Sequence, residues 1–179
     1  MKTIYLAGFD VFRQDAVAHG EALKQLCLRY GFEGWYPLDN SAPEHLSGRA
    51  LAQWIYEANV DLIRRADLVM ANMNPFRGHE PDSGTAFEAG FAIAMGKPVF
   101  VYLDEAQSLV QRIAVDERDD PPRHVDAAGY TVEDFGLNLN LMLACSATVV
   151  VGDAEQCLVR IAQSFDADPV VSGGDRRLG

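Results

Sequence analysis

The chain alternates short apolar runs with segments of helical periodicity, five times in succession. The apolar runs lie at residues 3–8, 32–38, 67–73, 97–103 and 147–152. The helical segments lie at residues 14–30, 51–63, 83–96, 137–146 and 153–165. A short, continuous apolar run bounded by turn residues is typical of a strand that is buried on both faces, and alternation with helices is typical of a parallel sheet. The pattern therefore predicts an α/β fold, a five-stranded parallel sheet with helices on both faces.

The length of the chain favours one domain. A chain of 179 residues can bury one full-sized core, and the periodic pattern ends near residue 165. We therefore expect a single domain over residues 1–165 and a loose tail over 166–179, where no periodicity is found. The segment 116–130 is charged and contains two prolines, so we expect an excursion or a lid there rather than core.

Charge and composition exclude several classes of partner. The formal net charge is -11, without a basic block or stripe, so a nucleic acid polymer is not an expected partner, although a single nucleoside is compatible. The three cysteines and four histidines are scattered, which predicts neither a disulfide framework nor a metal site, and we expect no cofactor.

The apolar start is too short for a signal peptide, and no window approaches the ~20 apolar residues of a membrane span. A cytoplasmic protein without a membrane partner is expected.

A ligand site is expected where three loops meet. In open parallel sheets, ligands bind beyond the carboxyl ends of the strands, near the point where the strand order reverses. The loops at 8–12 and 72–82 and the segment after Tyr102 should converge there. Gly8 begins the first loop, and Phe9 and Phe12 could either stack on a base or pack in the core. In the second loop, Arg77 could contact a substrate or anchor the loop.

A carboxylate in an otherwise small and apolar helix marks the second of these loops. Glu88 follows Asp82 by six residues, which on one helix turns the two side chains about 240° apart. If Asp82 lies at the helix cap, however, the two carboxyl groups can flank one small ligand. The helix N-terminus should then favour the ionised form of Glu88. The alternative is that Asp82 is an ordinary N-cap and that Glu88 faces water.

Four stretches of the sequence together resemble one known family. They are KTIYLAGFDVF at 2–12, ADLVMANMNPFRG at 66–78, DSGTAFEAGFAIAMGKPV at 82–99 and LNLNLML at 137–143. Their order and context are similar to those of the nucleoside 2-deoxyribosyltransferase family, over roughly residues 1–165. The resemblance implies a flavodoxin-like (Rossmann-like) fold and the exchange of nucleobases on 2'-deoxyribose.

The resemblance also implies roles for particular residues. Glu88 matches the family's glutamate nucleophile, Asp82 the aspartate that handles protons at the base, and Tyr5 the tyrosine that orients the nucleophile. Asn140 and Met142 match residues that the family supplies to a neighbouring subunit's site. The resemblance therefore implies a homo-oligomer in which active sites are shared between subunits.

One position departs from the family pattern. An aspartate of the family that helps to bind the base or the sugar is here Asn59, whose amide can both donate and accept a hydrogen bond. The base preference is therefore open. Asp61 is a poor substitute, because two residues along a helix turn it about 200° away. Trp35 and Trp54 are expected in the core.

The chemistry that such a site needs can be stated from the residues. Cleavage of an N-glycosidic bond leaves an oxocarbenium-like C1', which a carboxylate such as Glu88 can bond, while the departing base needs a proton that Asp82 can give. Deoxyribonucleosides and free nucleobases are the expected small-molecule partners. Transfer is favoured over hydrolysis only if water is kept out, and the loop 104–135 together with residues 137–143 of a neighbouring subunit could provide that cover. Two alternatives stay open: a deoxynucleoside or deoxynucleoside 5'-monophosphate N-glycosidase, and a non-catalytic nucleotide-sensing module.

Overall fold

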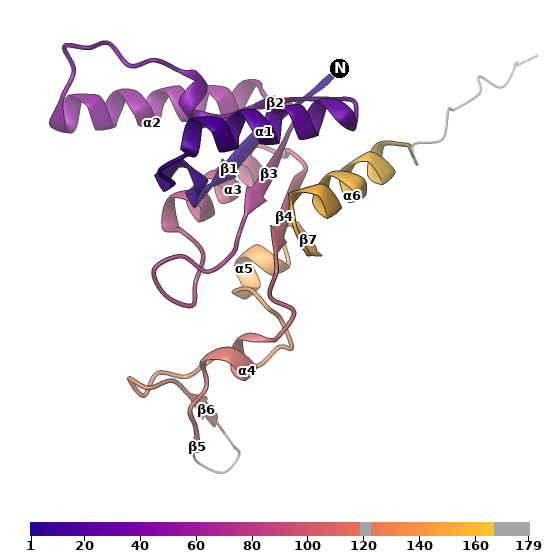
Figure 1. Cartoon of the computed structure of the whole chain (residues 1–179). Helices are drawn as coiled ribbons and strands as arrows, with labels where there is room; N and C mark the ends of the chain where they lie inside the picture. The colour runs from indigo at the N-terminus through magenta and orange to yellow at the C-terminus, as the bar shows by residue number, and fades with distance from the viewer. Residues whose placement is uncertain (119–122, 167–179) are drawn as a thin grey trace, which may run out of the picture.

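A computed structural model of the chain describes residues 1–118 and 123–166 and is shown in Figure 1. The strands are β1 (Lys2–Gly8), β2 (Phe32–Trp35), β3 (Leu68–Asn72), β4 (Val99–Leu103), β5 (Asp116–Arg118), β6 (Arg123–Val125) and β7 (Thr148–Val151). The helices are α1 (Ala16–Arg29), α2 (Gly48–Arg65), α3 (Ser83–Ala94), α4 (Leu109–Ile113), α5 (Leu141–Ala144) and α6 (Ala154–Asp166). Two 3-10 turns follow strands, η1 (Phe9–Phe12) after β1 and η2 (Pro37–Asp39) after β2.

Five strands form a parallel sheet in the order β2-β1-β3-β4-β7. The chain moves from β1 to β2 on one side and then returns to β3 on the other, so the strand order reverses between β1 and β3. This order is the flavodoxin-like one, with its switch point between these two strands. The predicted five-stranded parallel sheet with helices on both faces is thus confirmed.

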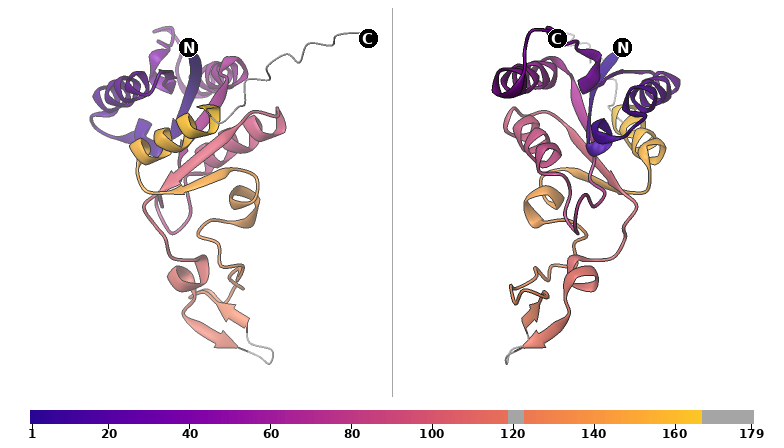
Figure 2. Two further views of the ribbon diagram at one scale, coloured as in Figure 1. Left: turned by 90° about the vertical axis from the view of Figure 1, so that its right-hand side faces the viewer. Right: turned by 60° about the vertical axis from the view of Figure 1, so that its left-hand side comes forward.

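Side chains of alternate residues build one core on each face of the sheet. Tyr5 and Ala7 of β1 point into the core beneath α2 and α3, whereas Ile4 and Leu6 point into the core beneath α1 and α6. The right-hand view of Figure 2 shows these two pairs of helices on opposite sides of the sheet. All five residues of β3 and of β4 are buried, as expected for strands covered on both faces.

Two predicted elements are shorter in the structure than in the sequence analysis. The second strand ends at Trp35, because Pro37 lacks an amide hydrogen for the sheet and instead opens η2. The helix predicted over 137–146 is limited to α5. There the side chain of Asn140 accepts a hydrogen bond from the Met142 amide and caps the helix, so the preceding residues do not continue it.

The segment between β4 and α5 extends away from the sheet as an arm, seen below the body in Figures 1 and 2. It carries α4 and a small second sheet, in which β5 and β6 pair antiparallel. The predicted excursion at 116–130 therefore contains regular structure, which the charged and proline-containing sequence did not indicate. Its residues 119–122 lie outside the described part of the chain.

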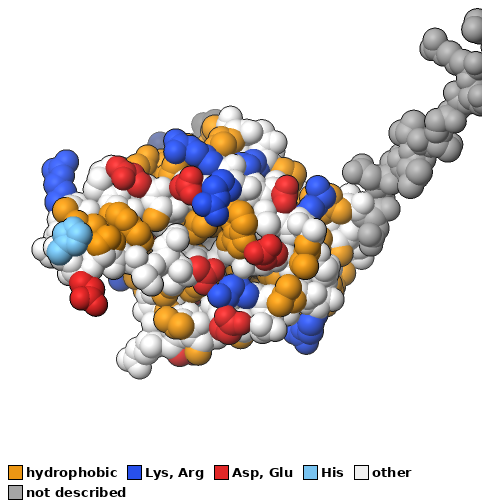
Figure 3. Space-filling model, turned by 90° about the horizontal axis from the view of Figure 1, so that it is seen from above, with side chains coloured by type: hydrophobic (Ala, Val, Ile, Leu, Met, Phe, Trp, Pro, Cys, Tyr) orange, Lys and Arg blue, Asp and Glu red, His pale blue; other side chains and the backbone are white. Residues whose placement is uncertain are grey.

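The C-terminal tail expected over 166–179 lies outside the described residues, except for Asp166, which ends α6. Within the described ranges, none of the helices has the length and apolar character needed to cross a membrane. On the face shown in Figure 3, lysine and arginine side chains are interspersed with aspartate and glutamate and with apolar side chains.

Candidate active site

A cavity of about 470 Å³ opens beside the carboxyl ends of β1 and β2 and is bounded by α2 and α3. Its size falls within the range of small-molecule sites. It is lined by Gly8, Val11, Phe12, Pro37, Leu38, Asn40, Ala42, Trp54, Ile55, Ala58, Asn59, Asp82, Gly84, Thr85 and Glu88. Most of these residues are apolar, and the ionisable ones are two carboxylic acids.

Glu88 is held by hydrogen bonds from two other elements. It lies in the second turn of α3, where Tyr5 of β1 donates its hydroxyl to Glu88 Oε1 at 2.6 Å. Asn59 Nδ2 of α2 approaches the same oxygen at 3.5 Å. Tyr5 is fully buried, and burial together with the neighbouring Glu88 raises its pKa, so its proton is retained for this bond.

Burial raises the pKa of Glu88 to about 7. The negative charge of Asp82 acts in the same direction, whereas the hydrogen bonds from Tyr5 and Asn59 favour the carboxylate and oppose the shift. The expectation that the helix N-terminus favours the ionised form of Glu88 did not include this burial, which acts in the opposite direction. The field of a helix end falls off within its first turn, and Glu88 stands beyond it, where desolvation is the larger effect.

Asp82 belongs to two structural features, a helix cap and the wall of the cavity. It is the N-cap of α3, where its Oδ2 accepts hydrogen bonds from the Thr85 amide at 2.9 Å and from the Thr85 hydroxyl at 3.0 Å. It also lines the cavity together with Glu88. Asp82 therefore caps α3 and borders the cavity at the same time, and capping does not remove it from the side of Glu88.

The structure brings three of the six predicted substrate-binding residues to the same cavity. Gly8, Phe12 and Asn59 line it. Phe9 is not among the lining residues, because its ring stacks on Phe76 at 4.9 Å between centroids. Asp61 is exposed and pairs with Arg65 on the outer side of α2, at 2.9 Å.

Asn140 and Met142 lie elsewhere, at a second cavity of about 550 Å³. This cavity is lined by other residues of α3, among them Ala86 and Gly90, so α3 separates it from Glu88. Asn140 Nδ2 donates to Glu133 Oε1 at 2.8 Å, in addition to capping α5. Within one chain, these two predicted residues do not meet the two carboxylates.

Sequence reasoning missed one wall of the cavity. Pro37, Leu38 and Asn40 follow β2, and the segment after Tyr102, which we expected at the site, contributes no lining residue. The physical reason is the strand order: β2 lies next to β1, whereas β4 lies on the far side of β3. These residues could have been identified from the sequence, because they directly follow a predicted parallel strand and therefore lie at the carboxyl edge of the sheet.

The position of Trp54 also differs from the prediction. It lines the cavity and is half-buried, not part of the core. Its neighbour Ile55 lines the cavity as well and is 45% exposed. Adjacent residues on a helix point about 100° apart. Two large apolar neighbours therefore indicated an apolar helix surface that is wider than the stripe facing the core.

The arrangement defines an α/β protein of the flavodoxin-like class, with a small-molecule cavity that carries two carboxylic acids beside the topological switch point. Within the described ranges, no cluster of three or more His, Cys, Asp or Glu side chains could hold a metal ion. Residues 4–142 match the family described as Nucleoside 2-deoxyribosyltransferase, and the chain belongs to that family.

Comparison with individual proteins agrees with this membership. The structure is similar to the 2-desoxiribosyltransferase from Leishmania mexicana, with a TM-score of 0.73, 34% identity, and coverage of 91% of this chain and 98% of that one. It shares its fold with the 2-deoxyribosyltransferase from Bacillus psychrosaccharolyticus, with a TM-score of 0.57, 19% identity, and coverage of 85% and 87%.

One curated relative, the uncharacterized protein C191.05c of Schizosaccharomyces pombe, is 31% identical over 113 residues. The match covers 62% of this chain and 54% of that protein, so the chain spans about half the length of this relative.

The raised pKa of Glu88 predicts a pH-dependent stability. Because the folded protein favours the acid form, it binds more protons than the unfolded chain between pH 4.5 and about 7, so its stability should fall as the pH rises through this window. The full loss should approach about 3 kcal/mol at pH 8. Glu88→Gln, whose amide oxygen can still accept from Tyr5, should therefore be more stable than wild type at pH 8 and show no such advantage at pH 4.5. Urea unfolding at both pH values measures the difference.

Glu44→Gln serves as the control for that comparison, because Glu44 is exposed and its substitution removes the same formal charge. If Glu88→Gln and Glu44→Gln differ from wild type by the same amount at every pH, the assignment of a raised pKa to Glu88 is wrong.

Proposed function

We propose that the protein transfers the 2-deoxyribosyl group between nucleobases. The observation that carries this proposal is the pair Glu88 and Asp82 in one largely apolar cavity, with Glu88 oriented by Tyr5. The membership of the family and the likeness to the Leishmania protein support it. Deoxyribonucleosides and free nucleobases are the substrates of the proposed reaction.

Glu88 acts as the nucleophile in this proposal. Tyr5 and Asn59 both approach Oε1, so we assign Oε2 as the oxygen that attacks C1' of the sugar. As the C1'–N bond breaks, its electron pair leaves with the base, and the Oε2–C1' bond forms on the opposite face. The product of this step is a covalent deoxyribosyl ester of Glu88 with inverted configuration at C1'.

Asp82 protonates the departing base. Nucleobases are poor anionic leaving groups, so a proton at a ring nitrogen lowers the barrier to cleavage. The first step needs this proton on Asp82, while Glu88 attacks as the carboxylate. The hydrogen bonds from Tyr5 and Asn59 favour the ionised form of Glu88.

The second step returns the sugar to a new base. The incoming base attacks C1', the ester bond to Glu88 breaks, and Asp82 takes up the proton of the attacking nitrogen. Two inversions give net retention at C1'. The apolar wall formed by Val11, Leu38, Trp54 and Ile55 disfavours bound water, so a base is the preferred acceptor during the covalent interval.

The decisive experiment is a base-exchange assay. The protein is incubated with deoxyinosine, with and without adenine, and the bases and nucleosides are separated by chromatography. Adenine-dependent formation of deoxyadenosine is expected. Release of hypoxanthine at the same rate without adenine would identify a hydrolase, and absence of any turnover with purine or pyrimidine donors would leave a binding module.

The role of Glu88 predicts a covalent adduct. Wild-type protein treated with a 2'-fluorinated arabinosyl donor should gain the mass of one sugar, because the fluorine slows the release of the intermediate. Glu88→Ala should show no adduct and should lose at least about 10³-fold in kcat, as expected when a nucleophile is removed. Intact-protein mass spectrometry and the exchange assay measure both. Wild-type turnover by Glu88→Ala would refute the assignment.

The role of Asp82 predicts a dependence on the leaving group. Asp82→Asn retains a side chain that can cap α3 but cannot protonate the base. It should lose about 10²-fold in kcat with deoxyinosine, the usual scale of general acid catalysis, and much less with a nitrophenyl deoxyriboside, whose leaving group needs no proton. Steady-state kinetics with both donors provide the comparison. An equal loss with both donors would contradict this role.

We also propose that the protein is a homo-oligomer in which each active site is completed by a second copy. Asn140 and Met142 lie across α3 from Glu88, and Met142 is 71% exposed, so neither serves the cavity of its own chain. In an oligomer, the amide of Asn140 can donate to or accept from a sugar hydroxyl in the neighbour's cavity. A twofold contact would give each dimer two such sites.

Subunit mixing tests this arrangement. Glu88→Ala and Asn140→Ala should each be nearly inactive, whereas co-refolding the two should restore part of the activity, because some hybrid sites draw both intact residues from different chains. Sedimentation of the wild type is measured in parallel. A fully active monomer, or a mixture that stays inactive although it forms hybrids, would rule out the shared site.

A further inference from the structure

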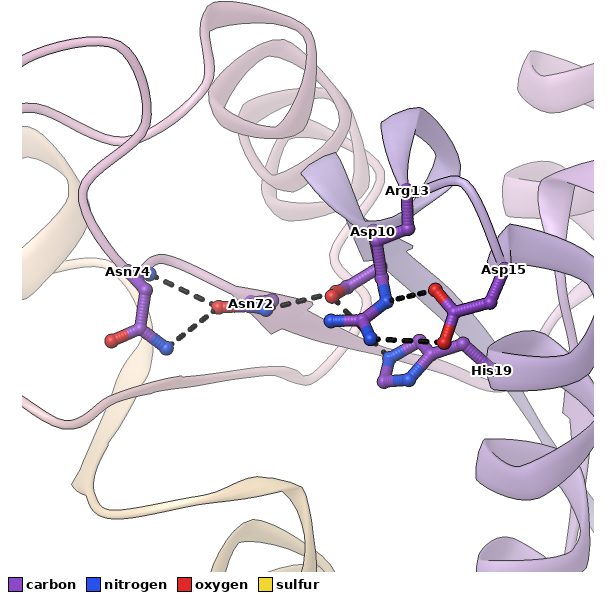
Figure 4. Close-up of polar contacts among 6 residues, drawn as sticks. All are labelled: Asp10, Arg13, Asp15, His19, Asn72 and Asn74. Carbon is purple, nitrogen blue, oxygen red and sulfur yellow. Dashed lines mark hydrogen bonds and ion pairs between the residues drawn. The ribbon is translucent and has the colours of Figure 1, made fainter.

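A second acidic group lies at the same sheet edge but takes no part in the proposed chemistry. Asp10 in η1 is only 5% exposed, and its carboxylate Oδ2 accepts a hydrogen bond from Asn72 Nδ2 at the end of β3, at 2.8 Å. His19 Nε2 of α1 lies 3.3 Å from Asp10 Oδ1. Figure 4 shows Asp10 between these two residues. A buried carboxylate is retained only where its partners compensate for lost hydration.

The hydrogen bonds continue from Asn72 to the neighbouring strand ends. Asn72 Oδ1 accepts from the amide of Asn74 at 3.1 Å and from its side chain at 2.9 Å, as Figure 4 shows. Asn74 Oδ1 accepts in turn from the amide of Asp104, just after β4. Because Asp10 can only accept, it forces the Asn72 amide to present its NH₂ to η1 and its oxygen to Asn74. The chain of bonds thus fixes η1 to the ends of β3 and β4.

Gly8 makes this contact possible. A Cβ atom at Gly8 would lie 2.8 Å from Asp10 Oδ2 and 3.0 Å from Asn72 Cβ, so a side chain there would push the two groups apart. Gly8 also lines the cavity. The glycine therefore lets Asp10 and Asn72 meet directly behind the cavity wall.

The residues after Asp10 form part of that wall. Val11 and Phe12 line the cavity, and the ring of Phe12 stacks on Phe76 at 5.5 Å with an angle of 11° between the planes. The guanidinium of Arg77 lies over both rings. Phe12 is 59% exposed, so burial alone does not hold it in place. Its position depends on the anchoring of η1 and on this stack.

We propose that Asp10 is a positioning residue for substrate binding: by accepting the hydrogen bond from Asn72, it fixes η1 so that Val11 and Phe12 form the wall against which the base of the substrate packs. The role rests on the proposed nucleoside chemistry. It acts on recognition of the donor rather than on bond cleavage, because neither Asp10 nor Asn72 lines the cavity.

The proposal predicts a specific split of kinetic constants. Asp10→Ala should raise the KM for deoxyinosine about tenfold, the scale of one lost charge-assisted hydrogen bond, while kcat stays within about threefold of wild type. Asp15→Ala is the matched control, because Asp15 is an exposed carboxylate of the same segment that pairs only with Arg13 in Figure 4. It should leave both constants unchanged.

Exchange of the side chains at positions 10 and 72 should rescue substrate binding. Asn72→Asp alone places two carboxylates against each other and should raise KM at least as much as Asp10→Ala. The double variant Asp10→Asn with Asn72→Asp should restore KM, because the amide at position 10 can donate to the carboxylate at 72 while its oxygen still faces His19. This pair of variants tests the proposal even if Asp10→Ala does not fold. Thermal unfolding of each variant checks its fold.

Calorimetry with deoxyadenosine, in a Glu88→Gln background that cannot turn over, measures the same effect as binding. A weaker Kd for Asp10→Ala and its recovery in the double variant support the proposal. Folded Asp10 or Asn72 variants with wild-type KM and Kd, or a loss confined to kcat, would overturn it. If the wild type itself neither binds nor converts nucleosides, the proposed function fails, and the role of Asp10 fails with it. If the wild type binds nucleosides without turnover, only the transfer reaction is refuted.

Discussion

The parallel pairing of β1 with β3 is the constraint on which the rest of this protein depends. The register sets Gly8 opposite Asn72, so both strands end at the same level and their loops leave the sheet together. The same strand β1 carries Tyr5 toward α3 and ends in the turn that forms one wall of the cavity. The helices that follow β1 and β3 are α1 and α3, and they lie on opposite faces of the sheet, so the loops leading to them diverge and leave room for a ligand at this edge.

Folding and the proposed chemistry make opposite demands on the side chain of Glu88. Desolvation favours its acid form, whereas the proposed nucleophilic attack needs the carboxylate. The hydrogen bonds from Tyr5 and Asn59 favour the carboxylate and so oppose the rise in the pKa of Glu88 that burial causes. An amide at position 59 is suited to that task, because an ionised carboxylate there would add a third negative charge beside Glu88 and could not donate.

Much of the fold followed from local sequence patterns. The strands β3 and β4 were placed to within about two residues, because a strand covered on both faces has a continuous apolar sequence. The cavity position of Glu88 and Asp82 also followed from a small-residue helix after a loop at the carboxyl edge. These features depend on neighbours in the chain or on a general rule of parallel sheets.

The remaining features depend on tertiary neighbours that the sequence does not identify. Asp10 and Asn72 stand 62 residues apart, and only the register of β1 and β3 brings them together. The protonation of Glu88 depends on how deeply α3 is covered, and the orientation of Trp54 depends on the loop that follows β2. For the same reason the antiparallel pairing in the arm went unpredicted: strands of three residues are too short to show a period.

Because Asp82 both caps α3 and lines the cavity, few substitutions at this position preserve the stability of the helix. Replacement of an N-cap aspartate by alanine destabilises a helix by about 1 kcal/mol, whereas asparagine and serine preserve the cap. If Asp82 protonates the base as proposed, a descendant that lost this reaction and only bound a nucleoside would be expected to carry asparagine or serine at this position. The proposed activity could then be lost with little loss of stability, because the cap of α3 would be preserved.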